Sequence, residues 1–227
     1  MDWFVILVMV AVFTFMACLT RFCRRLRQRH YSVPAEDFRK GHRWCMIDIF
    51  PQPTYCNISE HRIVEGASCA ICGICVEDQY MPDADRMLAC KEFATDTVSP
   101  IRHHWIKGNL PPCSICVVCN ESCGELPQLH DFRCCWCDRV THEQCVNGLD
   151  ESCDLGPFRE SIVPPNCLQL KLVGVRGRRR FVVKSVVSAL IPQWKPVIVV
   201  ANRKSGNGDA DNILQAFRRI LNPLQVI

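Results

Sequence analysis

The amino-acid sequence predicts a multi-domain chain with three kinds of part: an N-terminal membrane helix, two small cysteine-rich α+β modules, and the opening of an α/β domain. Three observations support this prediction. An uncharged apolar run opens the chain, 16 of its 18 cysteines fall between Cys23 and Cys153, and a β-branched run followed by a Gly-rich loop and an amphipathic segment closes it. Because the chain has 227 residues, each part must be small.

The apolar run at residues 3–20 reads WFVILVMVAVFTFMACLT and forms the predicted anchor. A helix of that length rises about 27 Å, which is close to the hydrocarbon thickness of a bilayer. Arginines crowd the segment that follows, at Arg21, Arg24, Arg25, Arg27 and Arg29. The run also lacks a small-residue cleavage site of the kind that ends a secretory signal. The alternative is a helix that dips into one leaflet without crossing.

The arginines after the anchor predict its orientation. Under the positive-inside rule, the N-terminus is lumenal or extracellular, and everything after Arg21 is cytosolic. Residues 21–41 then form a basic juxtamembrane linker. We expect a single-pass, membrane-embedded protein of the endoplasmic reticulum or plasma membrane, with anionic membrane lipids as partners of the basic segment.

The cysteines are spaced as metal ligands are. Several occur in C-x2-C pairs with a histidine at a fixed offset, and this spacing favours zinc over disulfides. Zinc thiolates imply a reducing compartment, which agrees with the cytosolic orientation. Segments this short bury too little core to be stable without such staples.

The second module, at residues 103–153, has the more specific pattern. Residues 134–153 read CCWCDRVTHEQCVNGLDESC, and their intervals resemble the closing half of the phorbol-ester/diacylglycerol-type zinc module. The resemblance implies two interleaved zinc ions, one held by His104, Cys134, Cys137 and Cys153. The other would be held by His142, Cys145 and an opening pair, either Cys113 with Cys116 or Cys116 with Cys119. The stretch HHWIKGNLPPCSIC favours the first pair, and the gap from Cys119 to Cys134 favours the second.

The first module, at residues 42–90, is a degraded copy of this pattern. One ligand set is complete: His42, Cys69, Cys72 and Cys90. The other retains Cys56, but Ser59, Glu77 and Tyr80 stand where the family has Cys, His and Cys. We therefore expect one zinc ion here, with Cys75 either a substitute ligand or a free thiol. Because charged residues fill segment 59–68, we expect a structural or regulatory role instead of tight diacylglycerol binding.

The remaining residues divide into a linker, 154–195, and the opening of an α/β domain, 196–227. The linker has a basic cluster at Arg176, Arg178, Arg179 and Arg180. Val197–Ala201 is predicted to be a buried strand, and residues 224–227 the start of a second strand. Between them, apolar residues recur at helical spacing: Ile213, Leu214, Phe217, Ile220 and Leu221. The crossover of this strand–helix–strand unit should be right-handed.

The loop NRKSGNG after the first of these strands resembles the first conserved loop of the diacylglycerol kinase catalytic domain. The resemblance implies that phosphate is cradled by Asn202, Ser205, Gly206, Asn207 and Gly208. Taken in order, the anchor, the modules and this loop are similar to the epsilon-type layout of that family, whose complete enzymes use ATP and magnesium to convert diacylglycerol to phosphatidic acid. The family's G-G-D-G-T motif does not occur in these 227 residues. The resemblance thus implies a chain truncated within a lipid kinase domain, inactive alone and without catalytic residues.

Other functions were weighed against this one. A non-catalytic, membrane-anchored zinc module for lipid or protein interaction is the main alternative. A RING-type ubiquitin ligase would need a later closing C-x2-C pair, which the order of the cysteines does not provide. A net charge of +4 is modest, and together with the anchor it argues against a nucleic-acid partner.

Overall fold

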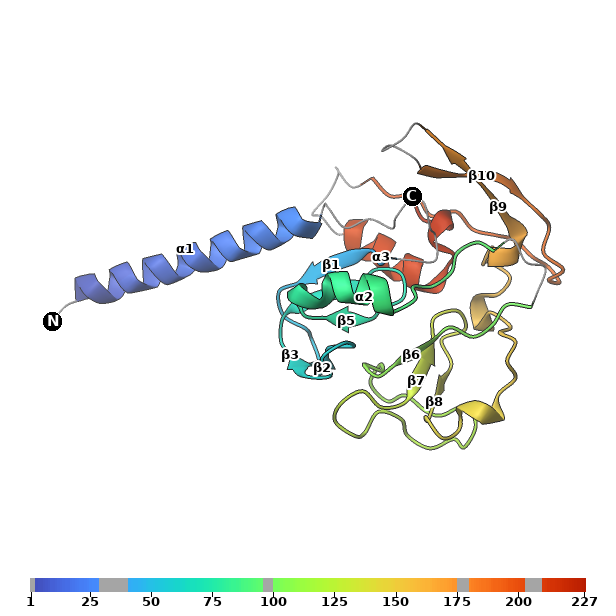
Figure 1. The fold of residues 1–227 in the computed structure, drawn as a ribbon, viewed down its shortest axis with the longest axis horizontal. Coiled ribbons are helices and arrows are strands. Elements are labelled where there is room, and N and C mark those ends of the chain that lie inside the picture. Colours follow the sequence, from blue (N-terminus) through green and yellow to red (C-terminus); the bar gives the residue numbers. More distant parts are fainter. Residues whose placement is uncertain (1–2, 29–40, 96–99, 175–179, 203–209) are drawn as a thin grey trace.

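The structure is a computed structural model that describes residues 3–28, 41–95, 100–174, 180–202 and 210–227. A long N-terminal helix, α1 (Trp3–Gln28), projects from a body built of small sheets and short helices (Figure 1). The described residues form two three-stranded and two two-stranded sheets.

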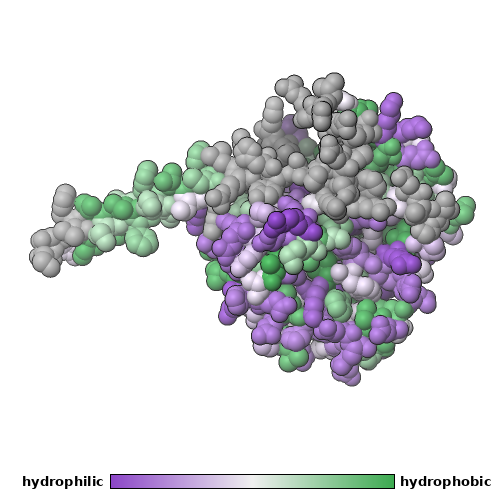
Figure 2. Space-filling view, in the orientation of Figure 1, coloured by the Kyte–Doolittle hydropathy of each residue, from purple (hydrophilic) through white to green (hydrophobic). Residues whose placement is uncertain are grey.

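Helix α1 is apolar and exposed along its length. The window Ile6–Cys23 has a mean hydropathy of 2.2 and no buried residue, so by length and composition this helix could cross a membrane. Figure 2 shows hydrophobic residues along most of the helix, whereas the visible face of the body mixes both kinds. The hydroxyls of Thr14 and Thr20 donate to the carbonyls of Ala11 and Ala17, so these polar groups are satisfied within the helix. The helix continues beyond the predicted anchor into the basic segment.

The first module contains a three-stranded antiparallel sheet, a short hairpin and one helix. The strands of the sheet, in spatial order, are β1 (Trp44–Ile47), β4 (Gly66–Cys69) and β5 (Cys75–Val76). The hairpin pairs β2 (Thr54–Tyr55) with β3 (Arg62–Ile63), and α2 (Met81–Met87) follows the turn Asp78–Tyr80. Asp85 ties α2 to β1, because its Oδ1 accepts from His42 N at 2.7 Å and from Trp44 Nε1 at 3.2 Å.

The second module repeats the antiparallel sheet with shorter strands. Its order is β6 (Trp105–Lys107), β7 (Phe132–Cys134), β8 (Val140–Thr141), and the turn Val146–Gly148 follows. In register, Trp105 faces Cys134 across β6 and β7.

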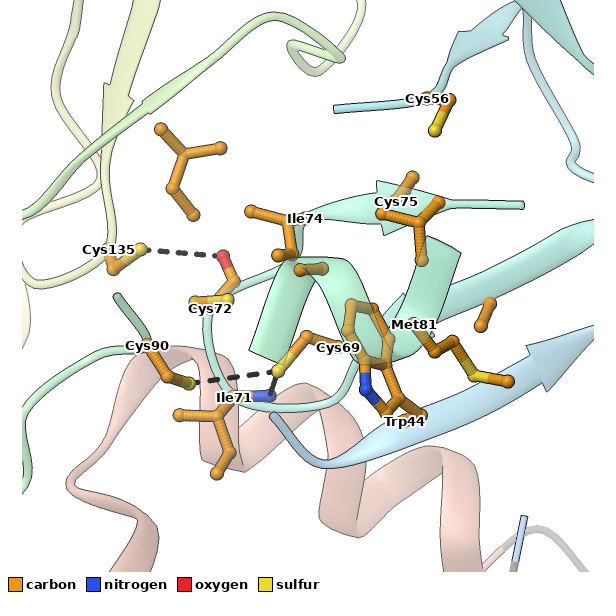
Figure 3. Packing of buried hydrophobic residues seen from close by; sticks show 14 of the residues in the cluster. Trp44, Cys56, Cys69, Ile71, Cys72, Ile74, Cys75, Met81, Cys90 and Cys135 are labelled. Atoms are coloured by element: carbon orange, nitrogen blue, oxygen red, sulfur yellow. Dashed lines mark hydrogen bonds between the residues drawn. The ribbon is translucent and has the colours of Figure 1, made fainter. Parts of the chain in front are cut away.

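The two modules pack against each other and share buried residues. Ile106 and Cys135 of the second module belong to the hydrophobic core of the first. Cys135 donates to the carbonyl of Cys72 at 3.4 Å (Figure 3). The Asn109 amide pairs with the backbone of Tyr55 twice, at 2.8 Å in each direction. The core of the first module is therefore completed by residues of the second.

Residues 154–195, expected to be a linker, contain regular structure. Strands β9 (Leu168–Val173) and β10 (Arg180–Val186) form an antiparallel hairpin, preceded by the turns Gly156–Phe158 and Pro165–Cys167. Leu155 and Ile162 are buried against the second module. The alternation of leucine with Gln169 and Lys171 along β9 was a strand signal that the prediction missed, whereas β10 has no such alternation. The basic cluster lies between the two strands, and its Arg176, Arg178 and Arg179 are outside the described residues.

The C-terminal segment forms the predicted helix, α3 (Ala210–Ile220), followed by the turn Pro223–Gln225. Val199 and Val226 pair as a parallel bridge, as a strand–helix–strand unit requires. The prediction of a buried strand at Val197–Ala201 was wrong, because Ile198 and Val200 are 68% and 73% exposed. Only one face of this extended segment is covered, and alternate side chains point away from it.

Polar side chains anchor this segment to the residues that follow each module. Asn222, fully buried, donates to the carbonyls of Phe93 at 2.7 Å and Val163 at 3.0 Å. Gln225 donates to the carbonyls of Ser161 and Val197. Because both amides are buried, their loss would strand several backbone groups without partners.

Lys91, the residue after the first module, joins all three parts. Its ammonium donates to the carbonyls of Arg219 at 2.9 Å and Leu221 at 3.0 Å, and lies 4.1 Å from the centre of the Trp136 ring. Burial lowers its pKa to about 8, although nearby thiols of the second module oppose this shift. The C-terminal end of α3 is thus held by a residue more than a hundred positions earlier.

Candidate metal centres

The described residues contain three groups of four Cys and His side chains whose ligand atoms lie within 4.8 Å of one another. The groups are His42, Cys69, Cys72 and Cys90; His103, Cys134, Cys137 and Cys153; and Cys116, Cys119, His142 and Cys145. We call them the first, second and third centres. Cys123 and Asp131 also approach His142, in a group that overlaps the third centre.

The first centre is fully buried in the first module. Its Sγ atoms of Cys69 and Cys90 are 3.8 Å apart, and Cys72 Sγ lies 3.3 Å from His42 Nδ1 (Figure 3 shows the cysteines). Zn–S bonds of about 2.3 Å place tetrahedral sulfur ligands about 3.8 Å apart, so the spacing fits zinc. His42 Nε2 lies 3.1 Å from the Leu88 carbonyl, an outer hydrogen bond that orients the ring. All four predicted residues meet here.

The second centre differs from the prediction in its histidine. Cys134 and Cys153 have sulfurs 4.0 Å apart, and Cys137 Sγ lies 3.5 Å from Nδ1 of His103, whereas His104 is not in the group. The His104 carbonyl instead accepts from Cys135 N at 2.9 Å, and burial lowers the pKa of the His104 ring.

A sequence signal for His103 existed but was missed. His42 lies two residues before Trp44, with ring centroids 5.0 Å apart, and His103 lies two residues before Trp105, at 4.7 Å. The H-x-W spacing of the first module therefore identifies His103 as the counterpart of His42, and the adjacent His104 points elsewhere.

The third centre resolves the ambiguous opening pair by geometry. Cys119 Sγ lies 3.3 Å and Cys145 Sγ 3.9 Å from His142 Nδ1, and Cys116 completes the group. His142 Nε2 is 3.0 Å from the Ser122 carbonyl, again orienting the ring. Cys113 is exposed and outside the group. Unlike the other two centres, this one has exposed members.

Neighbouring thiols in the second and third centres have opposite pKa shifts. Hydrogen bonds from Cys137 and Cys153 lower the pKa of Cys134, which in turn raises that of Cys137 to about 12. In the third centre, burial opposes ionisation of Cys116, but backbone hydrogen bonds outweigh it and lower its pKa to about 5. Burial and the neighbouring sulfurs raise the pKa of Cys145 to about 11. Each cluster thus accommodates one thiolate readily, and a bound zinc ion would supply the charge that the remaining thiolates need.

The first module has a second, incomplete ligand set, which retains only Cys56. Hydrogen bonds occupy the place where a metal would lie in a complete set. Ser59 Oγ donates to Glu77 Oε1 at 2.9 Å, and the backbone N–H of Ser59 points at Cys56 Sγ at 3.4 Å. Tyr80 packs against the core of the module. Cys75 Sγ lies 3.6 Å from the Gly73 carbonyl and, within the described residues, joins no metal-ligand group.

The predicted phosphate loop is largely outside the described residues. Asn202 follows the extended segment that pairs with Val226, whereas Ser205, Gly206, Asn207 and Gly208 are not described. Their predicted role in phosphate binding stays a prediction.

Comparison with curated proteins shows that this chain is similar to diacylglycerol kinases. Diacylglycerol kinase eta of Drosophila melanogaster is 28% identical over 219 residues, which cover 89% of this chain and 11% of the relative. Diacylglycerol kinase delta of Mus musculus is 27% identical over 208 residues, covering 86% of this chain and 16% of the relative. The chain therefore spans only a small fraction of the length of these relatives. No family model matches the chain, and no solved structure matches it.

Proposed function

We propose that this chain is the N-terminal, regulatory part of a membrane-anchored diacylglycerol kinase, which transfers the γ-phosphate of ATP to diacylglycerol and forms phosphatidic acid. The observation that supports it is the match to diacylglycerol kinases over 89% of the chain. The order of anchor, two modules and kinase opening is that of the epsilon type, and we propose that type.

The three centres are the sites at which we propose zinc binds, one ion in the first module and two in the second. The donor sets consist of soft thiolates and imidazoles, which zinc prefers. In each centre, zinc would stabilise a small module whose hydrophobic core is limited. ATP and magnesium would bind the complete catalytic domain, with Asn202 and the loop after it at the edge of that site.

The anchor places the modules in the cytosol under this proposal, next to anionic lipids and diacylglycerol. The chain supplies its own test of topology, since Asn57-Ile58-Ser59 and Asn120-Glu121-Ser122 are glycosylation sequons. Expression in cells followed by glycosidase treatment should produce no shift in mass. A shift that disappears in Asn57→Gln or Asn120→Gln would place the modules in the lumen and contradict the proposed topology.

Labelled phosphate transfer from ATP to diacylglycerol in mixed micelles tests the activity. We expect the 227-residue chain to give no turnover above background, because the sequence lacks the family's glycine-rich motif and one strand–helix unit cannot enclose a core. A form extended through a complete catalytic domain should be active. Turnover by the 227-residue chain would contradict the assignment of catalysis to later residues.

Silence from a folded extended form would contradict the kinase assignment. It would favour the alternative, a membrane-anchored zinc module for interaction only. The zinc content of the same preparations separates failure of the fold from failure of the chemistry.

A further inference from the structure

A cleft of about 440 Å³ lies between the second module and helix α3. One wall comes from β7 and the turn after it, with Arg133 and Trp136, and another from Pro157 and Phe158. Helix α3 supplies the third wall through Gln215, Ala216, Arg219 and Ile220. None of the residues proposed for phosphate binding in the kinase loop lines it.

Two arginines converge at one end of this cleft. A Cβ added to Gly73 would lie 2.9 Å from Arg133 Nη2 and 3.9 Å from Arg219 Cζ, so both guanidinium groups pack against the same glycine. Gly73 has a φ of +93°, and any side chain here would displace the Arg133 guanidinium. The backbone of the first module thus brings two like charges together.

The charge of this pair is incompletely balanced. Arg133 Nη1 pairs with Asp138 Oδ1 at 2.9 Å. Arg219 Nη2 donates to the neutral Ser68 hydroxyl at 2.9 Å, and its buried Nε has no hydrogen-bond partner within the described part of the chain. Among the described residues, Arg219 therefore has no ion-pair partner, and an unpaired, buried donor is a costly arrangement that an anion would relieve.

Apolar side chains make up much of the remaining lining, beside the neutral amides of Asn212 and Gln215. Trp136, Phe158 and Ile220 line the cleft, and Phe158 is 51% exposed in spite of its size. A cleft that is cationic at one end and apolar along its walls matches a ligand with an anionic head and a hydrocarbon tail. A free inorganic anion would leave those apolar walls in water.

We propose that this cleft binds a phosphate monoester carried by an acyl-bearing lipid, with the phosphate between Arg133 and Arg219 and the acyl chain against Trp136 and Phe158. The cleft joins the second module to α3, so the ligand would contact both. This inference does not depend on the kinase assignment, because it rests only on the residues of the cleft.

The test is isothermal titration calorimetry on the full chain, held in phosphatidylcholine nanodiscs, with dihexanoyl phosphatidic acid as the probe. Inorganic phosphate and dihexanoyl phosphatidylcholine are titrated in parallel. We expect saturable binding of phosphatidic acid and at least about tenfold weaker binding of either comparison probe. Equal affinity for inorganic phosphate would overturn the lipid part of the proposal, and no saturable binding of phosphatidic acid would overturn all of it.

Variants locate the site. Arg219→Gln and Arg133→Gln should each weaken binding of phosphatidic acid about tenfold, whereas Asp138→Asn, which removes the competing carboxylate, should tighten it. Ala216→Phe should block the cleft without changing charge. Arg86→Gln is the matched control, because Arg86 is a paired, exposed arginine on α2, outside the cleft.

Each variant is first checked for an unchanged zinc content. Binding that falls equally in Arg86→Gln and Arg219→Gln would reflect net charge alone and would overturn the site. Unchanged affinity in both Ala216→Phe and Asp138→Asn would also overturn it, even if the arginine variants failed to fold.

Discussion

The turn at Cys56 and the turn at Cys116 have the same backbone, but only the second is part of a candidate metal centre. In the first module, Glu60 N donates to the Cys56 carbonyl at 2.9 Å; in the second, Asn120 N donates to the Cys116 carbonyl at 3.0 Å. Glu60 and Asn120 both adopt the left-handed conformation, with φ of 60° and 62°. The turn survives the loss of its ligands, so local backbone hydrogen bonds are sufficient to define it here.

In the first module, a hydrogen bond and packing against the second module take the place of a metal ion. The Ser59–Glu77 hydrogen bond spans the position where Cys119 and His142 meet in the second module. Ile106 and Cys135 of the second module also pack into the core of the first module. The comparison teaches that a zinc site can be lost when packing against an intact module supplies the stability.

The largest effect should come from removing a ligand of the second centre. Cys134→Ser leaves three ligands around a buried position, and since structural zinc contributes roughly 10 kcal/mol to such folds, the second module should unfold. Native mass spectrometry of the full chain should show the count fall from the expected three zinc ions, together with loss of amide protection in β7. Cys56→Ser is the matched control and should keep the count at three; a fall there would mean that the lost site still binds metal.

Restoring the lost site should have the next largest effect. The triple variant Ser59→Cys, Glu77→His, Tyr80→Cys places a full ligand set on the retained turn, so the zinc count should rise from three to four. The melting temperature of the first module should rise as well, since metal binding adds to folding free energy. A count that stays at three in a folded variant would show that the turn has diverged further than its hydrogen bonds indicate.

Breaking the contact between the modules and α3 should have a smaller effect. Lys91→Met removes the donor to two carbonyls and should lower the free energy of unfolding by about 2 kcal/mol. Lys107→Met is the control, since its ion pair with Glu143 is exposed and contributes about 0.5 kcal/mol. Urea denaturation followed by circular dichroism measures both. Equal effects would mean that the buried lysine adds nothing beyond a surface charge.

The last expected effect is a pH dependence of zinc affinity at the third centre, which has no counterpart at the turn of Cys56. Burial raises the pKa of Cys145 to about 11, and the hydrogen bond to the Ser122 carbonyl raises the pKa of His142 to about 9. Zinc must therefore displace a proton from each of these two groups at neutral pH, whereas backbone hydrogen bonds lower the pKa of Cys116 to about 5 and leave it ionised. Affinity should therefore fall as pH falls, by about tenfold per pH unit for each proton displaced. Competition with a chromophoric chelator between pH 6 and 8 measures the slope. A flat profile would contradict the raised pKa of Cys145.

The sequence predicted the features that depend on local spacing. Helical periodicity located α3, and the spacing in the sequence named the cysteines that the first and second centres bring together, but it left open which opening pair belongs to the third. Spacing could not decide between two adjacent candidates for the histidine of the second centre. Both His103 and His104 precede the cysteines at an acceptable distance. Only the H-x-W comparison with His42, whose ring lies beside Trp44, separates them.

Long-range contacts were not predictable from spacing. A lysine is normally expected at the surface, but Lys91 is buried between Trp136 and the end of α3. Asn222 and Gln225 are polar residues in a turn, and their burial depends on carbonyls contributed by distant segments. The pairing of β9 with β10 was hidden for a different reason, since β10 lacks the alternation that marks β9.

The lysine contact at the end of α3 has a consequence for how the chain is made. Helix α3 has 11 residues, too few to be stable in water without partners. Its last carbonyls are capped by Lys91, and its apolar side faces the second module, both of which leave the ribosome earlier. The two modules would then serve as a folded surface on which α3 forms, and zinc supply during synthesis would decide whether that surface exists.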